Sequence, residues 1–156
     1  MYRCRQLTPA DVAPFKQLLA VFGAAFEDLE TYQGAVPSDA YLAASLGKSH
    51  VIALVAQQED EVVGGLVAYV LEKVERERSE IYIYDLAVAE PHRRRGIATA
   101  LIQTLKRLGR GLGAYVVFVQ ADRGDDPAIK LYESLGTRED VLHFDFVVDA
   151  KADAPE

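Results

Sequence analysis

Several kinds of site are excluded by what this chain lacks. Its 156 residues include one cysteine, Cys4, and no tryptophan, and a single cysteine excludes a disulfide framework within the chain. The three histidines (His50, His92 and His143) lie far apart and form no zinc-spaced cluster with cysteine, so we expect no metal site. No apolar run reaches membrane length and the N-terminus has no signal-peptide core. We therefore expect a cytoplasmic protein without a membrane partner.

Cationic residues are also in short supply. Lys and Arg number 17 against 24 Asp and Glu, which gives a formal net charge of −7. This balance argues against a nucleic-acid partner and is compatible with a cationic substrate. A surplus of surface acids that serves solubility is a common alternative. Half of the residues are hydrophobic and 26% are charged, which predicts one soluble domain over residues 1–148 and a polar C-terminal tail over residues 149–156.

Residues 80–99 are the most informative stretch. Residues 80–89 are β-branched, aromatic and apolar, which predicts a strand, and from Gly96 the apolar residues fall at helical spacing. Three consecutive arginines, Arg93 to Arg95, stand between the two. A helix N-terminus has unpaired N–H groups and favours negative charge, and glycine lets a ligand approach the backbone. The junction therefore predicts a phosphate or pyrophosphate site, with a solvated basic turn as the alternative.

This junction resembles the acyl-CoA loop of the Gcn5-related N-acetyltransferases, in which Gln/Arg-x-x-Gly-x-Gly/Ala follows a strand. The chain matches it with Arg93, Gly96 and Ala98. The resemblance implies acetyl-CoA as cosubstrate and an α/β (α+β) fold with a central mixed, mostly antiparallel sheet of six or seven strands and about four helices on both faces. The residues expected to bind acetyl-CoA are Leu86, Ala87, Val88, Arg93, Arg94, Arg95, Gly96, Ile97, Ala98, Thr99, Asp125 and Ala128.

The periodicity of the remaining chain predicts further strands and helices. Between the first two helices, the acidic Glu27, Asp28 and Glu30 lie on a connecting segment. The expected strands are 2–7, 51–56, 62–71, 114–121 and 141–148, and the expected helices are 9–26, 38–46, 96–112 and 127–135.

Residues 125–136 extend the resemblance. Many family members carry Asn-x-x-Ala-x-x-Leu-Tyr-x-x-x-Gly here, and this chain has Asp125 in place of the Asn, followed by Tyr132 and Gly136. In the family the tyrosine usually protonates the departing CoA thiolate, and a phenol with a pKa near ~10 suits that leaving group. Tyr132 is therefore the predicted general acid, and a core tyrosine with a satisfied hydroxyl is the alternative.

Longer blocks resemble the type-I aminoglycoside 3-N-acetyltransferases, the gentamicin resistance enzymes. The likeness spans most of residues 50–146 and is looser before that. It implies transfer of acetyl to the 3-amino group of the 2-deoxystreptamine ring of gentamicin-type aminoglycosides. The family alone suggests a homodimer. The blocks that carry the likeness are 79–88, 92–94, 96–102, 112–116, 119–122, 124–128 and 143–145.

Direct transfer in a ternary complex requires a neutral amine, so a carboxylate is expected to take its proton. Asp85 ends the strand nearest the acyl loop and is preferred to Glu80 as the base. Strand alternation puts these two residues on opposite faces unless a bulge intervenes. A structural hydrogen-bond acceptor is the alternative role for Asp85.

A polycationic aminoglycoside also needs fixed negative charge in its binding cleft. A helix N-cap is the alternative role for Asp125 or Asp126. Two other functions stay open: acetylation of another small amine, such as a polyamine or a peptide N-terminus, and a CoA-binding regulator without catalysis. The residues expected to contact the acceptor are Tyr82, Tyr84, Asp122, Asp125, Asp126 and Asp145.

Overall fold

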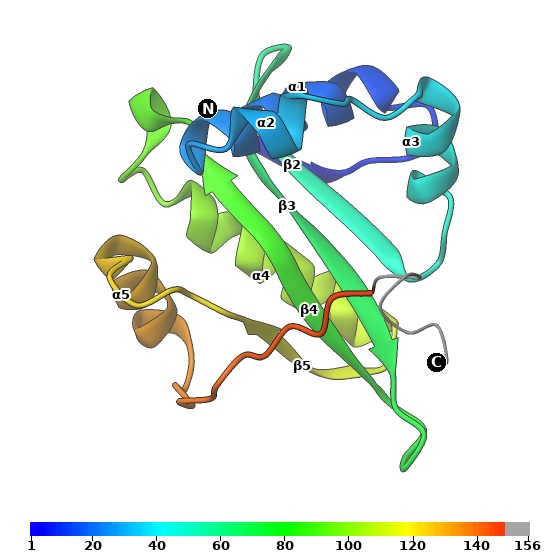
Figure 1. Cartoon of the computed structure of the whole chain (residues 1–156), viewed down its shortest axis with the longest axis vertical. Helices are drawn as coiled ribbons and strands as arrows, with labels where there is room; N and C mark the ends of the chain where they lie inside the picture. The colour runs from blue at the N-terminus through cyan, green and yellow to red at the C-terminus, as the bar shows by residue number, and fades with distance from the viewer. Residues whose placement is uncertain (149–156) are drawn as a thin grey trace, which may run out of the picture. The chain divides into compact units, whose positions relative to one another are not determined.

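A five-stranded mixed sheet forms the centre of residues 1–122 in the computed structural model, which describes residues 1–148 (Figure 1). The strands lie in chain order; the first four pair antiparallel, and the fifth pairs parallel to the fourth. A parallel neighbour needs a crossover, which a helix provides here. The strands are β1 Arg3–Gln6, β2 Val51–Gln58, β3 Glu61–Glu72, β4 Ser79–Val88 and β5 Ala114–Val119.

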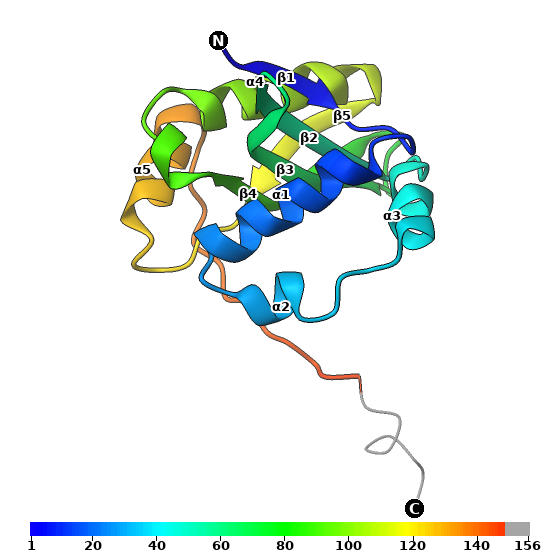
Figure 2. The same ribbon diagram turned by 90° about the horizontal axis from the view of Figure 1, so that it is seen from above.

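Helices cover both faces of this sheet (Figure 2). On one face, α1 buries Phe15, Leu18 and Phe22 in a cluster with residues of β2 and β3. On the other, the crossover helix α4 buries Leu101 and Leu105. The elements of these two layers are α1 Val12–Ala25, α2 Leu29–Gln33, α3 Asp39–Leu46, the 3₁₀ turn η1 Glu90–His92 and α4 Ile97–Gly111.

Among the described residues, 123–148 belong to a second unit of the chain. Its helix α5, Asp126–Leu135, begins after Asp125, whose carboxylate accepts a hydrogen bond from the Ala128 N–H at 3.4 Å. The helical prediction for this segment is therefore confirmed. The single domain expected over residues 1–148 stays a prediction, and the expected tail, residues 149–156, lies outside the described residues.

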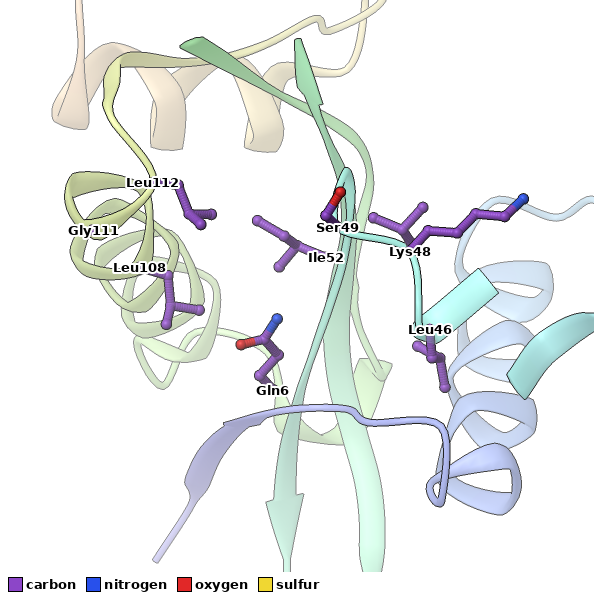
Figure 3. Close-up of a pocket in the computed structure, with 9 residues that line it drawn as sticks. Gln6, Leu46, Lys48, Ser49, Ile52, Leu108, Gly111 and Leu112 are labelled. Carbon is purple, nitrogen blue, oxygen red and sulfur yellow. The ribbon is translucent and has the colours of Figure 1, made fainter. Parts of the chain in front are cut away.

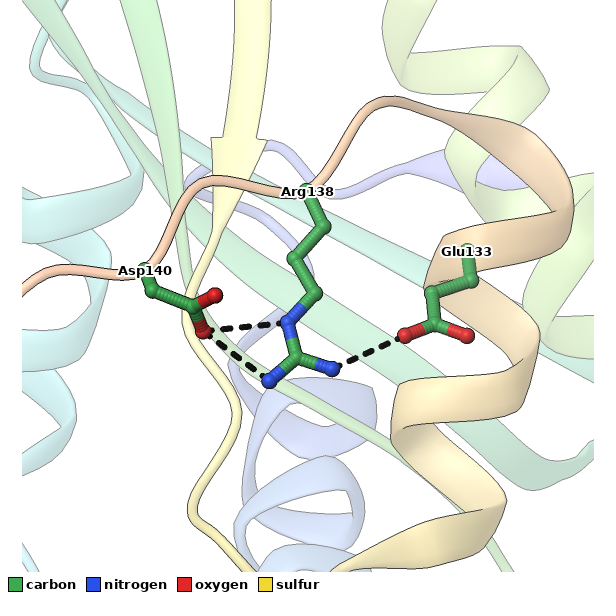
Figure 4. A network of polar contacts seen from close by, with 3 residues as sticks. All are labelled: Glu133, Arg138 and Asp140. Atoms are coloured by element: carbon green, nitrogen blue, oxygen red, sulfur yellow. Dashed lines mark hydrogen bonds and ion pairs between the residues drawn. The ribbon is translucent and has the colours of Figure 1, made fainter.

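The expected strand over residues 141–148 is wrong, and so is the sheet of six or seven strands. The segment has the apolar composition of a strand, but a strand exists only where backbone groups pair in a ladder, and no ladder within residues 1–148 includes it. Just before it, Arg138 bridges Glu133 and Asp140 with N–O distances of 3.0 and 2.9 Å (Figure 4).

About four helices were expected, and residues 1–148 contain five α-helices. The additional one is α2, which lies in the segment interpreted as a connection. Asp28 caps it by accepting a hydrogen bond from the Thr31 N–H at 3.2 Å. Five residues are too few for a helical period to be visible in the sequence. None of the described helices is long and apolar enough to cross a membrane.

Truncation of a core leucine on α4 tests the packing of this layer. Leu101 is fully buried, so Leu101→Ala leaves a cavity and should lower the free energy of unfolding by ~2–5 kcal/mol. Leu112, just after the same helix, is 47% exposed, and Leu112→Ala should cost less than ~1 kcal/mol. Urea unfolding of both variants measures the difference. Equal losses would contradict the assignment of Leu101 to the core.

Candidate active site

The turn between β4 and α4 has an unusual backbone. Arg94 has φ +63° and Gly96 has φ +79°, both in the left-handed region. That region is uncommon for a residue with a side chain such as Arg94, and such conformations are concentrated at ligand sites. A Cβ at Gly96 would meet no atom within 4 Å, so the space over this backbone is open. The turn can therefore admit a ligand close to the main chain.

The N-terminus of α4 presents free donors to that space. Gly96 is its N-cap and makes no side-chain cap, and the first turn has no acidic residue. Its first N–H groups therefore lack helical partners, and the helix dipole favours an anion. Ile97 is buried, so it can offer only its backbone N–H, while Ala98 and Thr99 are small. These features fit the pyrophosphate of acetyl-CoA.

Two of the three arginines have fixed partners. The Arg93 Nε donates to the Val88 carbonyl at 2.9 Å, which holds the turn against the end of β4. A guanidinium nitrogen of Arg95 donates to the Tyr2 hydroxyl at 2.6 Å, and that hydroxyl lies 3.2 Å from the Nδ1 of His92. Sequence reasoning did not find Tyr2, because nothing local connects residue 2 with this turn.

Strands β4 and β5 separate beside the turn. Their pairing ends at Ile83 and Val119, while β4 continues to Val88 with β3 as its only strand neighbour among the described residues. The backbone of Leu86 and Ala87 on the β5 side is therefore available to a ligand. This separation supports the predicted acetyl-CoA contacts of Leu86, Ala87 and Val88.

A β-bulge determines where Asp85 lies. In the β3–β4 ladder, Val67 pairs with Asp85 and the adjacent Ala68 pairs with Ile83, so Tyr84 has no partner residue. The extra residue reverses the alternation of the strand beyond it. Asp85 thus lies on the same face of the sheet as Tyr82, the face covered by α1 and α2. The sequence left open whether a bulge interrupts the alternation, and the structure contains one.

Aromatic rings surround this carboxylate. Tyr82 stacks on Phe118 of β5 with ring centroids 4.7 Å apart, and Tyr84 lies between Tyr82 and Tyr69 at 5.8 and 5.9 Å. The Tyr32 hydroxyl, from α2, donates to Asp85 at 2.9 Å. Sequence reasoning named Tyr82 and Tyr84 and missed the other three rings. Tyr32 was missed because its helix was not recognised.

The pKa of Asp85 is raised by burial, and the hydrogen bond from Tyr32 partly offsets this rise. Burial, followed by the contact with Asp85, raises the pKa of Tyr32 far above its ordinary value. Tyr32 therefore stays protonated and donates, while Asp85 is the member of the pair that can accept a proton. A carboxylate with a raised pKa is a better proton acceptor than an ordinary one.

Glu80, the second candidate base, lies in a different environment at the start of β4. Its carboxylate accepts a hydrogen bond from the Tyr115 hydroxyl and lies 3.8 Å from the Lys73 Nζ. The Arg78 guanidinium stacks 3.7 Å over the Tyr115 ring. Asp85 lies five positions after Glu80 on β4, which corresponds to about 17 Å along an extended strand. Glu80 therefore belongs to a polar cluster of its own.

The remaining residues that the sequence assigned to cofactor or acceptor binding lie at the end of the first unit or in the second unit. Asp122 is the last residue of the first unit. Asp125 caps α5, as the alternative interpretation expected, and Ala128 supplies the N–H for that cap. Asp126 starts the helix, and Asp145 lies 2.8 Å from the Nε2 of His143. Their contact with an acceptor stays a prediction.

Tyr132 lies on α5, in the second unit. Burial, followed by the charge of Asp125, raises the pKa of its phenol. A raised pKa keeps the proton on the hydroxyl, as a general acid requires before the transfer step. Its role as that acid stays a prediction.

A cavity of about 310 Å³ lies elsewhere in the first unit, at the C-terminal end of α4 (Figure 3). Leu108 and Leu112 line one side, and Gln6, Lys48 and Ile52 line the other. Leu108 lies twelve positions after Gly96, which corresponds to about 18 Å along the helix. The cavity is therefore distinct from the turn at the start of α4. No group of three or more His, Cys, Asp or Glu within residues 1–148 could hold a metal ion.

The chain belongs to the Acetyltransferase (GNAT) family, whose pattern matches residues 17–137. The family uses acetyl-CoA, which agrees with the anion-binding features at the start of α4.

Solved structures of high similarity include two aminoglycoside acetyltransferases from uncultured soil metagenomic samples. One is 58% identical with a TM-score of 0.94, over 96% of this chain and 99% of that one. The other, in complex with sisomicin, is 34% identical with a TM-score of 0.88, over 95% and 97%. An N-alpha-acetyltransferase of Sulfurisphaera tokodaii is 32% identical over 90 residues, covering 51% of this chain and 54% of that protein. The chain thus spans about half the length of this curated relative.

Substitution of Gly96 tests the acyl-CoA turn. A Val side chain fills the open space over the backbone, so Gly96→Val should weaken acetyl-CoA binding at least ~10-fold by calorimetry. Gly113 is a matched control because it has a similar φ, +73°, and equally open surroundings at the far end of α4. Gly113→Val should carry similar backbone strain and leave the affinity unchanged. Equal affinities for the two variants would reject the turn as the binding site.

Proposed function

We propose that this protein is an acetyl-CoA-dependent aminoglycoside 3-N-acetyltransferase that confers resistance to gentamicin-type drugs. The observation that carries the proposal is 58% identity, over 96% of the chain, to an aminoglycoside acetyltransferase. The second similar enzyme, solved with sisomicin, also supports it. The 3-amino position rests on the sequence blocks that resemble the type-I enzymes.

The site offers suitable chemistry for a polycationic acceptor. An aminoglycoside carries several ammonium groups, which bind to carboxylates and to the faces of aromatic rings. Asp85 supplies a half-buried carboxylate, and Tyr69, Tyr82 and Tyr84 supply neighbouring rings. In this proposal Asp122, Asp125, Asp126 and Asp145 add negative charge around the acceptor.

The reaction needs one proton removed and one supplied. Acetyl-CoA, when bound, provides an activated thioester. Asp85 takes the proton of the attacking amine, and its raised pKa favours this step. Tyr132 gives a proton to the departing thiolate. The N–H groups at the start of α4 fix the pyrophosphate, so much of the rate gain comes from positioning.

An amine panel tests this proposal against its alternatives. The purified protein is mixed with acetyl-CoA and gentamicin, sisomicin, kanamycin, spermidine or a short peptide, and thiol release is followed. We expect turnover with gentamicin and sisomicin, and NMR of the product should locate the acetyl group on the 3-amino nitrogen. Turnover with the peptide alone would favour a protein N-terminal acetyltransferase, which the Sulfurisphaera relative suggests. Acetyl-CoA binding without any turnover would favour a regulator.

Removal of the Tyr132 hydroxyl tests the general acid. Tyr132→Phe should lower kcat by ~10²–10⁴, because a positioned acid contributes about that factor. Acetyl-CoA affinity, measured by calorimetry, should stay at the wild-type value, since the hydroxyl acts only on the departing thiolate. A kcat within about twofold of wild type would show that another group supplies the proton.

A further inference from the structure

Helix α2 brings a single phenol to the candidate base. Tyr32 donates its hydroxyl proton to Oδ1 of Asp85 at 2.9 Å, although 53 residues separate the two in the chain. No other side-chain hydrogen bond and no ion pair to Asp85 occurs within residues 1–148. The second carboxylate oxygen, Oδ2, is therefore left to interact with an acceptor amine.

The packing around α2 holds Tyr32 in this position. The Tyr32 ring packs against Phe22 of α1 and against Phe26, the residue that follows this helix. The centroids of these two rings lie 5.9 and 5.8 Å from the centroid of Tyr32. A Cβ at Gly23 would lie 3.2 Å from the Tyr32 Cβ. Glycine inside a helix costs ~0.5–1 kcal/mol relative to alanine. Here it permits the close approach that brings the phenol to Asp85.

The groups that face this pair are mainly other phenols. Tyr69 from β3 and Tyr82 and Tyr84 from β4 lie around Asp85, and Asp28 at the start of α2 lies near Tyr32. A phenol whose pKa is at or above its ordinary value is neutral near pH 7. Burial raises the pKa of both Tyr69 and Tyr82.

The helices packed on this face add little charge. On α1 the only ionisable residue is Lys16, and it pairs with Asp39 of α3. Tyr41 of α3 faces Tyr69. Within residues 1–148, the ionised form of Asp85 therefore depends on one side-chain hydrogen-bond donor, Tyr32.

We propose that Tyr32 is a positioning residue of the acetyl transfer: its phenol holds one oxygen of Asp85, and the other oxygen is thereby oriented to take the proton of the acceptor amine. The proton of Tyr32 stays on Tyr32 throughout. This inference rests on the proposed function, because it assigns Asp85 as the base. It adds that a short helix not visible in the sequence sets the orientation and acidity of that base.

Two phenol–carboxylate pairs on the same strand give a matched experiment. Tyr32→Phe removes the donor to Asp85, and Tyr115→Phe removes the donor to Glu80. The dependence of kcat on pH is measured for wild type and both variants, with the amine that wild type acetylates fastest. In parallel, the Asp85 carboxyl is titrated by ¹³C NMR, with its signal assigned from its absence in Asp85→Asn.

Loss of a donor to the charged form raises a carboxyl pKa. In Tyr32→Phe, the Asp85 titration and the acidic limb of the kcat profile should both move upward by about one pH unit, so kcat below the limb should fall roughly tenfold. The KM for acetyl-CoA should not change, and Tyr115→Phe should leave the acidic limb at the wild-type pH. In an Asp85→Asn background, Tyr32→Phe should cause no further loss.

The outcomes separate the two proposals. An unmoved Asp85 titration in Tyr32→Phe, or an acidic limb that moves with Tyr115→Phe instead, overturns the role of Tyr32. If wild type acetylates an amine other than an aminoglycoside, the proposed function fails while the pH profile still decides the role of Tyr32. If wild type acetylates no amine, both the proposed function and the role of Tyr32 in acetyl transfer are overturned. Gly23→Ala is a second variant, which displaces α2 but keeps the Tyr32 hydroxyl. It should move the acidic limb of the kcat profile upward, as Tyr32→Phe does. Thermal melting checks that the variant is folded.

Discussion

The bulge at Tyr84 is the constraint on which the candidate site depends. Without it, the regular alternation of β4 would point Asp85 at α4, into the layer that contains Leu101 and Leu105. An isolated carboxylate there would be costly to bury. With it, Asp85 lies among tyrosines on the opposite face, and the backbone beyond it continues toward the turn at Gly96. One unpaired residue, Tyr84, thus determines the face on which Asp85 lies, on the strand that leads to the turn at Gly96.

The two ends of β4 carry similar chemical groups in different settings. At each end a tyrosine hydroxyl donates to a carboxylate, Tyr32 to Asp85 and Tyr115 to Glu80. Lys73 adjoins the second pair, whereas no ion pair to Asp85 occurs within residues 1–148. The same kinds of side chain therefore have different surroundings at the two ends of the strand, and in our proposal the proton is taken at Asp85.

The turn that we propose binds acetyl-CoA combines backbone and side-chain features that suit an anionic ligand. Gly96 leaves room above the start of α4, and the uncapped N–H groups provide the donors. Arg93 is bonded to the end of β4 and Arg95 to Tyr2. These arginines therefore fix the turn as well as contribute positive charge. A fixed turn loses less entropy when it binds an anion than a free loop would.

The sequence by itself determined the features that depend on neighbouring residues. The β4–α4 junction and the helix after it are local and were predicted from spacing and residue type, and the cap at Asp125 was the alternative to its expected binding role. Only the tertiary structure decided which face Asp85 occupies, because the bulge depends on the register between β3 and β4. It also decided the partner of Asp85, since Tyr32 reaches it through a five-residue helix that has no visible period. The strand expected at residues 141–148 was wrong because composition cannot supply the ladder partner that a strand requires.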